Sequence, residues 1–361
     1  MFSFKNISSL LLALIMALTC LSACTYEMEQ TGDSSASSEI ASSQTASSQT
    51  DSSEISVESI ESSASEEDPT VHKCVAVDDY FENVPYVGLY NADTLEPYYT
   101  EKATDNLYPA SQTKLVTAQV AAKYGDLNEI IYVGSELNLV QPHSSLFGIR
   151  QGMSMTLEQM LYGLMLPSGN DAAYTIAVNI ARKHSGNPSL SDTEAVEYFC
   201  GLMNDFCSEI GAHNSNFTNP EGWDDPYQYT TVEDLALITS KALENETIAK
   251  IMATPQIKFL VNSGETFNIT NSNKLIKKSS AYYNPCVIGG KTGSTDLAGS
   301  CLVAVFEIEG VRYIAVADCC PDDSVRYTTV TKLIDLATQL QKTHRLGEFC
   351  INCEVSADSQ E

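Results

Sequence analysis

Strand-like runs of hydrophobic residues occur in two regions of this chain that are far apart in the sequence. Residues 86–90 and 97–99 flank the turn residues Asn91–Asp93, a pattern typical of a strand, a turn and a second strand. Further β-type runs come late in the chain, at 286–288, 301–306 and 313–317. Glu309-Gly310 supplies a hairpin turn between the last two. The pattern therefore predicts strands at both ends of residues 71–345.

Between these strands the apolar residues recur at helical spacing. A helix begins near Ser111, and residues 156–159 (Thr-Leu-Glu-Gln) form a capping box that opens another, which Pro167 stops. Helical patterns fill most of 171–250, with a loop at 219–223, and a final helix covers about 325–342. This order predicts an α+β fold, in which the terminal segments form one sheet around a helical insert.

The first residues have the pattern of an export signal. Lys5 precedes an apolar run, Leu10–Leu18, which is shorter than the roughly 20 residues that cross a bilayer. Residues 21–24, Leu-Ser-Ala-Cys, are similar to the lipobox of bacterial lipoproteins, in which the Cys sulfur is acylated. We predict a lipoprotein signal peptide over 1–23 and a lipid on Cys24. The alternative is plain cleavage after Ala23, with Cys24 unmodified.

Residues 24–70 have the composition of a disordered tether rather than of a folded domain. Residues 25–70 hold 11 Asp or Glu and no Lys or Arg, and 34–65 contain no aromatic residue. Such a segment cannot bury enough apolar surface to offset its ordering entropy. We therefore assign a lipid-anchored Ser/Glu-rich tether to 24–70, a folded domain, which holds the candidate chemistry considered next, to 71–345, and an acidic tail to 346–361. The protein is expected at the outer face of a bacterial cell membrane, towards the cell wall.

The charge balance argues against a nucleic-acid partner. The chain has 20 Lys and Arg against 47 Asp and Glu, a formal net charge of −27. Nucleic-acid binding requires a basic face, which this composition does not favour. The acidity is more simply explained by the solubility of an exported protein.

The cysteine and histidine residues do not predict a metal site. Cys350 and Cys353 form one C-x-x-C, and Cys319 and Cys320 are adjacent, but no second C-x-x-C or nearby His completes a zinc tetrad. Cys200 and Cys207 are interpreted as buried small hydrophobic residues. The five His are scattered, and there is no G-x-S-x-G motif. We predict no metal and no cofactor, and no catalytic role for a thiol.

Three short motifs are the candidate chemistry. Ser111 and Lys114 form S-x-x-K at a helix start, Ser168 and Asn170 form S-x-N on a loop, and Lys291–Gly293 form K-T-G at the end of the first late strand. Each motif alone is common. Their occurrence together, in this order and spread over about 180 residues, is a specific signal.

This set of motifs resembles that of penicillin-binding proteins and class A β-lactamases. The surrounding residues are similar to the low-molecular-weight penicillin-binding proteins that are serine-type D-alanyl-D-alanine carboxypeptidases: Pro109–Lys114, Leu164–Ala172, Phe217–Pro220, Gly222–Pro226 and Gly289–Gly293. The resemblance covers roughly 75–340. It implies a five-stranded antiparallel sheet flanked by helices, with a helical insert lobe. It also implies stem peptides ending in D-Ala-D-Ala as substrates and β-lactams as covalent inhibitors.

The residue chemistry is consistent with these roles. A serine hydroxyl needs an adjacent base, and Lys114 lies three residues after Ser111, on the same helix face. Burial and a neighbouring cation such as Lys291 would lower the pKa of Lys114 so that it can act as general base. Asn170 is expected to orient Lys114 and hold the substrate amide. Ser168 is expected to relay a proton to the departing amine.

The remaining predicted contacts concern the two ends of the scissile peptide. The amides of Ser111 and Ser294 are expected to form the oxyanion hole. Lys291, Thr292 and Gly293 are expected to bind the terminal carboxylate of the stem peptide.

Two other functions remain as alternatives. A β-lactamase adds fast deacylation, which needs a carboxylate that activates water. Glu221 falls in about the right region, but Gly222–Asp225 departs from the expected motif, and we interpret Glu221 as a solvated loop residue. A catalytically silent lipoprotein that binds β-lactams or peptidoglycan is disfavoured, since it has no physical need for all the motif residues.

Overall fold

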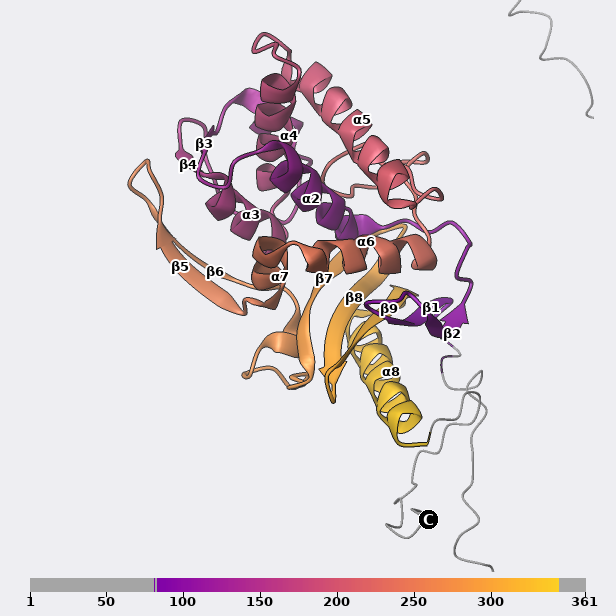
Figure 1. The fold of residues 1–361 in the computed structure, drawn as a ribbon. Coiled ribbons are helices and arrows are strands. Elements are labelled where there is room, and N and C mark those ends of the chain that lie inside the picture. Colours follow the sequence, from indigo (N-terminus) through magenta and orange to yellow (C-terminus); the bar gives the residue numbers. More distant parts are fainter. Residues whose placement is uncertain (1–80, 82, 344–361) are drawn as a thin grey trace, which may run out of the picture. The chain divides into compact units, whose positions relative to one another are not determined.

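The computed structural model describes residue 81 and residues 83–343 (Figure 1). The predicted signal peptide, Cys24, the tether, the acidic tail and the Cys350–Cys353 motif lie outside these residues. None of the helices in the described part of the chain combines the length and the apolar character needed to cross a bilayer.

The central sheet has five antiparallel strands in the order β2-β1-β9-β8-β7, which confirms the predicted architecture. Its strands are β1 (Tyr86–Asn91), β2 (Pro97–Glu101), β7 (Val287–Thr295), β8 (Gly299–Ile308) and β9 (Val311–Cys320). The early strand β1 pairs with the late strand β9, so that Val87 lies opposite Ala317. Glu309 and Gly310 both have positive φ, at 50° and 81°, as expected for the hairpin turn between β8 and β9.

The helices fill the sequence between the two groups of strands and close the chain. The α-helices are α2 (Lys114–Tyr124), α3 (Leu157–Met165), α4 (Asn170–His184), α5 (Asp192–Ile210), α6 (Val232–Glu244), α7 (Glu246–Ala253) and α8 (Asp323–Thr343). In the described part of the chain, three short 3-10 helices accompany them: η2 (Ala110–Thr113), η3 (Ser135–Leu139) and η4 (Lys274–Ile276). The predicted capping box opens α3, because Thr156 Oγ1 accepts from the Gln159 amide and Gln159 Oε1 accepts from the Thr156 amide.

Two small antiparallel sheets complete the fold. One joins β3 (Ile130–Tyr132) to β4 (Ser154–Thr156), and the other joins β5 (Gln256–Leu260) to β6 (Thr266–Thr270). The sequence pattern did not predict the β5–β6 hairpin, which extends beside α7 and β7 in Figure 1. It lies largely at the surface, so its strands have no continuous apolar run to mark them.

The two faces of the central sheet pack against different helices. In Figure 1, α8 lies on one side of the sheet, while α6 and the other helices lie on the opposite side. The side chains of β8 divide accordingly: Val303 and Val305 join the core of the helical region, whereas Leu302 and Phe306 join the core beneath α8. This alternation follows from the two-residue repeat of a strand, and it fixes which face of the sheet meets the catalytic motifs.

The structure corrects two details of the sequence interpretation. Lys291–Gly293 lie within β7 rather than at the end of a strand, since β7 continues to Thr295. Ser111 lies in the 3-10 turn η2, and the regular α-helix begins only at Lys114. Local pattern could not show either point, because both depend on pairing and packing with distant segments.

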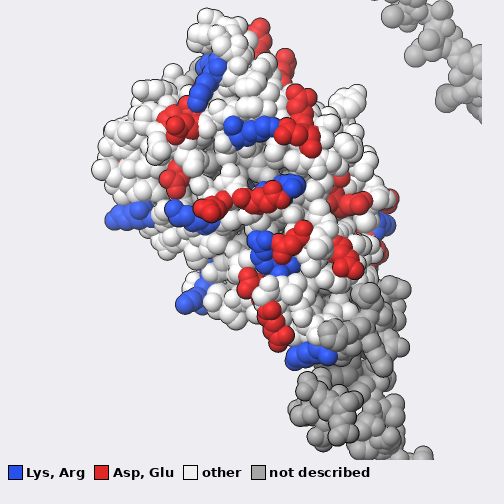
Figure 2. Space-filling view, viewed as in Figure 1, with Lys and Arg blue, Asp and Glu red and all other residues white. Residues whose placement is uncertain are grey.

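The surface charge is mixed on the face that Figure 2 shows. Lysine and arginine side chains lie among aspartate and glutamate side chains there, with no separate basic patch on this face. Several form exposed ion pairs, such as Lys183 with Glu129 at 2.6 Å. Exposed pairs of this kind contribute between about 0 and 1 kcal/mol to stability.

Candidate active site

Ser111 lies where the turn η2 meets strand β7 and the loop at 219–223. A Cβ on Gly293 of β7 would lie only 2.9 Å from the Ala110 Cβ and 3.1 Å from the Ser111 amide nitrogen. A Cβ on Gly222, which has a φ of 94°, would lie 1.8 Å from the Ala110 carbonyl oxygen. Because glycine has no Cβ, the strand and the loop can approach the backbone of Ser111 closely. Any other residue at either position would keep them further away.

Lys114 is fully buried and its three ammonium protons all have acceptors. Its Nζ lies 2.8 Å from Ser111 Oγ, 2.8 Å from Asn170 Oδ1 and 2.6 Å from the carbonyl oxygen of Glu221. Burial lowers the pKa of Lys114 to about 8, although the negative charges of Glu221 and Asp171 oppose this shift. A lysine with this pKa is partly neutral at mildly alkaline pH and can then accept a proton from the serine.

The second and third motifs meet on the other side of Lys114. Lys291 is 1% exposed, and its Nζ donates to Ser168 Oγ at 2.8 Å and to the Thr292 carbonyl oxygen at 2.7 Å. Burial, and then the positive charges of Lys114 and Arg326, lower the pKa of Lys291 well below its usual value. Ser168 is held in the left-handed region, at a φ of 62°. The structure thus brings residues from the three distant motifs together in two neighbouring hydrogen-bonded groups, one around Lys114 and one around Lys291.

A cavity of about 470 Å³ opens above these residues. Ser111, Asn170, Trp223 and Ser294 contribute to its lining. Ser294 is exposed at the end of β7, and Thr292 next to it is buried, with its hydroxyl 2.6 Å from that of Ser272. Of the predicted site residues, Ser111, Asn170 and Ser294 thus line this cavity, while Lys114, Ser168, Lys291 and Thr292 are buried.

Glu221 differs from the sequence interpretation. It is 1% exposed, not solvated, and its Oε1 accepts a hydrogen bond from the Tyr174 hydroxyl at 3.0 Å. Asn219 holds the loop inwards, because its Oδ1 accepts from the amides of Gly222 and Trp223 at 2.8 and 3.1 Å. The burial of Glu221 comes from this tertiary packing, which the polar run after it in the sequence does not indicate.

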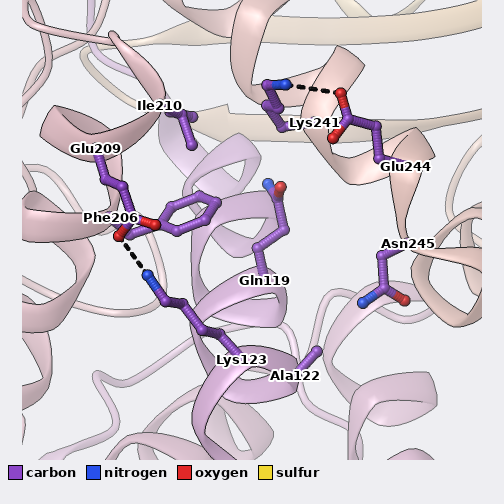
Figure 3. A pocket seen from close by; sticks show the side chains of 9 residues that line it. All are labelled: Gln119, Ala122, Lys123, Phe206, Glu209, Ile210, Lys241, Glu244 and Asn245. Carbon is purple, nitrogen blue, oxygen red and sulfur yellow. Dashed lines mark hydrogen bonds and ion pairs between the residues drawn. The ribbon is translucent and has the colours of Figure 1, made fainter.

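A second cavity, of about 550 Å³, lies among α2, α5 and α6 (Figure 3). Its polar side chains are engaged with one another: Lys123 pairs with Glu209, and Lys241 pairs with Glu244 at 2.7 Å. Phe206 forms part of the wall, 5.8 Å from Lys123 Nζ. None of the described residues that line this cavity is a serine, threonine or cysteine, so it offers no hydroxyl or thiol nucleophile, although it is the larger of the two.

Within residues 81 and 83–343, no three or more His, Cys, Asp or Glu side chains gather in an arrangement that could hold a metal ion. Cys200 and Cys207 are buried, as predicted, and burial raises the pKa of each thiol to about 12.

Comparison with known proteins identifies the family. The sequence profile of the D-alanyl-D-alanine carboxypeptidases matches residues 89–317, which include all three motifs. The chain belongs to the D-alanyl-D-alanine carboxypeptidase family. This confirms the resemblance drawn from the motifs.

Individual members of this carboxypeptidase family are similar over most of the described region. D-alanyl-D-alanine carboxypeptidase DacF of Bacillus subtilis is 30% identical over 262 residues, which cover 72% of this chain and 63% of that protein. DacB2 of Mycobacterium tuberculosis is 31% identical over 208 residues, covering 57% of this chain and 64% of that protein. The chain thus spans slightly less than two thirds of the length of these two relatives.

Solved structures support the same fold. A DD-transpeptidase of Streptomyces has 26% sequence identity and a TM-score of 0.65, and the match covers 72% of this chain and 98% of that one. A D-alanyl-D-alanine carboxypeptidase of Mycobacterium tuberculosis has 25% identity and a TM-score of 0.63, covering 74% and 95%.

Sequence reasoning missed three residues around the carboxypeptidase motifs: Glu221 contacts Lys114, Tyr174 contacts Glu221, and Arg326 contacts Gly293. Glu221 was misread, and Tyr174 and Arg326 were not singled out. Arg326 of α8 is buried and donates to the Gly293 carbonyl oxygen at 2.7 Å, so it supports the β7 motif from behind. Tyr174 and Arg326 lie in ordinary amphipathic helices, and no local signal distinguishes them from neighbouring residues.

Proposed function

We propose that this protein is a serine-type D-Ala-D-Ala carboxypeptidase, which removes the terminal D-alanine from peptidoglycan stem peptides through an acyl-enzyme on Ser111. One observation carries the proposal. In a chain of this family, a buried lysine lies 2.8 Å from the hydroxyl of the motif serine, with Asn170 fixing its position.

The acylation step uses Lys114 as base. Neutral Lys114 takes the hydroxyl proton as Ser111 Oγ attacks the carbonyl carbon of the penultimate D-alanine. The amides of Ser111 and Ser294 stabilise the negative charge that develops on the carbonyl oxygen. The carbon–nitrogen bond then breaks, and Ser168 passes a proton to the leaving amine. Water subsequently hydrolyses the ester and frees Ser111.

Strand β7 is proposed to hold the carboxylate of the departing D-alanine. Lys291 supplies a positive charge and Thr292 a hydroxyl, both buried in β7 just before Ser294, which lines the cavity. Binding a carboxylate there offsets the burial of an ammonium that contacts only neutral acceptors in the described residues, Ser168 Oγ and the Thr292 carbonyl. A β-lactam carries a carboxylate and a reactive carbonyl, and is expected to acylate Ser111 by the same route.

The test is intact-mass analysis of the protein after penicillin treatment, with D-alanine release from a D-Ala-D-Ala peptide measured in parallel. We expect one penicilloyl adduct, mapped by peptide mass to Ser111, together with D-alanine release. Ser111→Ala should lose both. An adduct on another serine, or D-alanine release that survives in Ser111→Ala, would contradict the proposal.

A β-lactamase is the second candidate, and the burial of Glu221 beside Lys114 favours it more than the sequence did. A buried carboxylate at the catalytic cavity could activate a water for deacylation. Rapid hydrolysis of penicillin without D-alanine release would establish this function. An adduct with neither activity would instead indicate a silent β-lactam receptor. The similar Streptomyces structure is named a DD-transpeptidase, so amine acceptors belong in the same assay.

We further propose that the protein is an exported lipoprotein, anchored through a lipid on Cys24 and facing the cell wall. The motif at 21–24 and the tether composition support this proposal together. Cys24→Ser should release the protein from the membrane fraction in soluble form. Retention of Cys24→Ser in the membrane would place the anchor elsewhere.

A further inference from the structure

Lys114 and Glu221 are two buried ionisable groups without a direct ion pair. The Nζ of Lys114 donates to a hydroxyl, an amide oxygen and the backbone carbonyl of Glu221, all of them neutral. A buried ammonium with neutral acceptors still requires a counter-charge nearby, since its desolvation is costly. The relevant counter-charge must therefore come from a carboxylate that acts through space.

Two carboxylates act on Lys114, and they differ in how they are held. The carboxylate of Asp171, on α4, accepts hydrogen bonds from the backbone amides of Phe147, Gly148, Ile149 and Ala172 at 2.8 to 3.1 Å. Four backbone amides therefore fix the position of this carboxylate. Asp171 thus serves mainly to hold the loop before it.

Glu221 is held much less completely. Its Oε1 accepts from the Tyr174 hydroxyl, and its Oε2 is buried without a donor among the described residues. In the described part of the chain, no lysine or arginine forms an ion pair with it at contact distance. The other titratable groups nearby are the Cys200 thiol of α5, close to Tyr174, and Lys291 of β7, beyond Lys114.

We propose that Glu221 is a positioning residue that acts through Lys114 and sets the pH at which Lys114 becomes a base. This inference rests on the proposed acylation of Ser111. The negative charge of Glu221 favours the ammonium form of Lys114 in the resting enzyme. It therefore opposes part of the lowering of the Lys114 pKa that burial causes. Conversely, burial raises the pKa of Glu221, while Lys114, Tyr174 and Asn170 lower it.

The experiment measures the acylation rate by a fluorescent penicillin as a function of pH. For the wild-type protein the rate should rise through a midpoint near pH 8, the pKa of Lys114. Glu221→Gln removes the charge that raises the pKa of Lys114, so the midpoint should move to lower pH by on the order of one unit. Glu221→Asp keeps the charge and should stay closer to the wild-type midpoint than Glu221→Gln does.

Two further variants control the experiment. Asp296 lines the same cavity but is exposed, so Asp296→Asn removes an equal charge that solvent screens, and the midpoint should not move. Tyr174→Phe removes the donor that keeps Glu221 charged, so it should lower the midpoint in the same direction by less. If circular dichroism shows that Glu221→Gln is unfolded, Tyr174→Phe decides the question.

Three results would overturn the inference. A Glu221→Gln protein with slower acylation at every pH and an unmoved midpoint would assign Glu221 a structural role alone. Rapid penicillin clearance that Glu221→Gln abolishes would make Glu221 the base for water instead. A wild-type protein that is not acylated at any pH would remove the proposed function itself, and this inference with it.

Discussion

The active site contains two buried lysines that share a chemistry and differ in their surroundings. Lys114 and Lys291 are each almost fully buried, and each donates to a motif serine at 2.8 Å. Burial lowers the pKa of both lysines, but two carboxylates oppose this shift at Lys114, whereas two cations add to it at Lys291. The neighbours, rather than the residue type, thus distinguish the proposed general base, Lys114, from Lys291, which is proposed to bind a carboxylate.

The largest effect that tests this difference is expected at Lys114. Lys114→Arg keeps the positive charge, but a guanidinium does not deprotonate in proteins, so no base remains for Ser111. We expect acylation by penicillin to slow by about 100-fold or more. Thr113→Ser, one position earlier, is the matched control and should be mild. Near-normal acylation in Lys114→Arg would show that Lys114 is not the general base for Ser111.

Lys291 should matter most for substrates that carry a terminal carboxylate. We expect Lys291→Ala to lower kcat/KM about 10- to 100-fold for a peptide ending in D-Ala-D-Ala, since a charged hydrogen bond contributes about 1.5–3 kcal/mol. The same peptide with an amidated C-terminus provides the control and should lose less. Equal losses on the two peptides would mean that Lys291 acts through Ser168 and not on the carboxylate.

The approach of the loop to Ser111 can be tested separately from either lysine. Gly222→Ala places a methyl group against the Ala110 carbonyl at a φ of 94°, so the loop or the turn must move. We expect a loss of about 1–3 kcal/mol in the free energy of unfolding, measured with denaturant, together with slower acylation. Gly264→Ala, also at positive φ but in open space, controls for the backbone strain alone.

The smallest effect is expected at Cys200, whose thiol faces Tyr174. Because burial raises the pKa of this thiol to about 12, it is neutral where Lys114 titrates. Cys200→Ala should therefore cost some stability but leave the pH midpoint of acylation unchanged. A moved midpoint would show that a neutral group also controls Lys114, which would weaken the argument from charge.

The fold was predictable where burial follows a simple period. Val303 and Leu302 lie on opposite faces of one strand, and the run of apolar residues around them marks that strand in the sequence. The proximity of Ser111 and Lys114 was predictable because residues three apart lie on the same face of a helix. The hairpin β5–β6 was not, since its exposed strands carry polar residues at many positions.

The missed part of the site depends on contacts between distant segments. Glu221 is buried because Gly222 packs against Ala110, more than 100 residues earlier in the chain. Arg326 supports β7 from a helix that the pattern identifies only as amphipathic. The polarity of a loop residue therefore does not determine its exposure. A carboxylate next to a glycine can be buried when that glycine packs closely against a distant segment, as Gly222 does.

The pairing of β1 with β9 has a consequence for how the protein matures. Val87 and Ala317 are about 230 residues apart in sequence, and closing so long a loop is slow, because its entropy is lost before many contacts form. Ser111 and Lys114 leave the ribosome long before β7, β8 and β9 exist to hold them. We therefore expect the site to stay incomplete during synthesis until nearly all of residues 86–320 have left the ribosome. Acylation of Ser111 would therefore serve as a measure of complete folding.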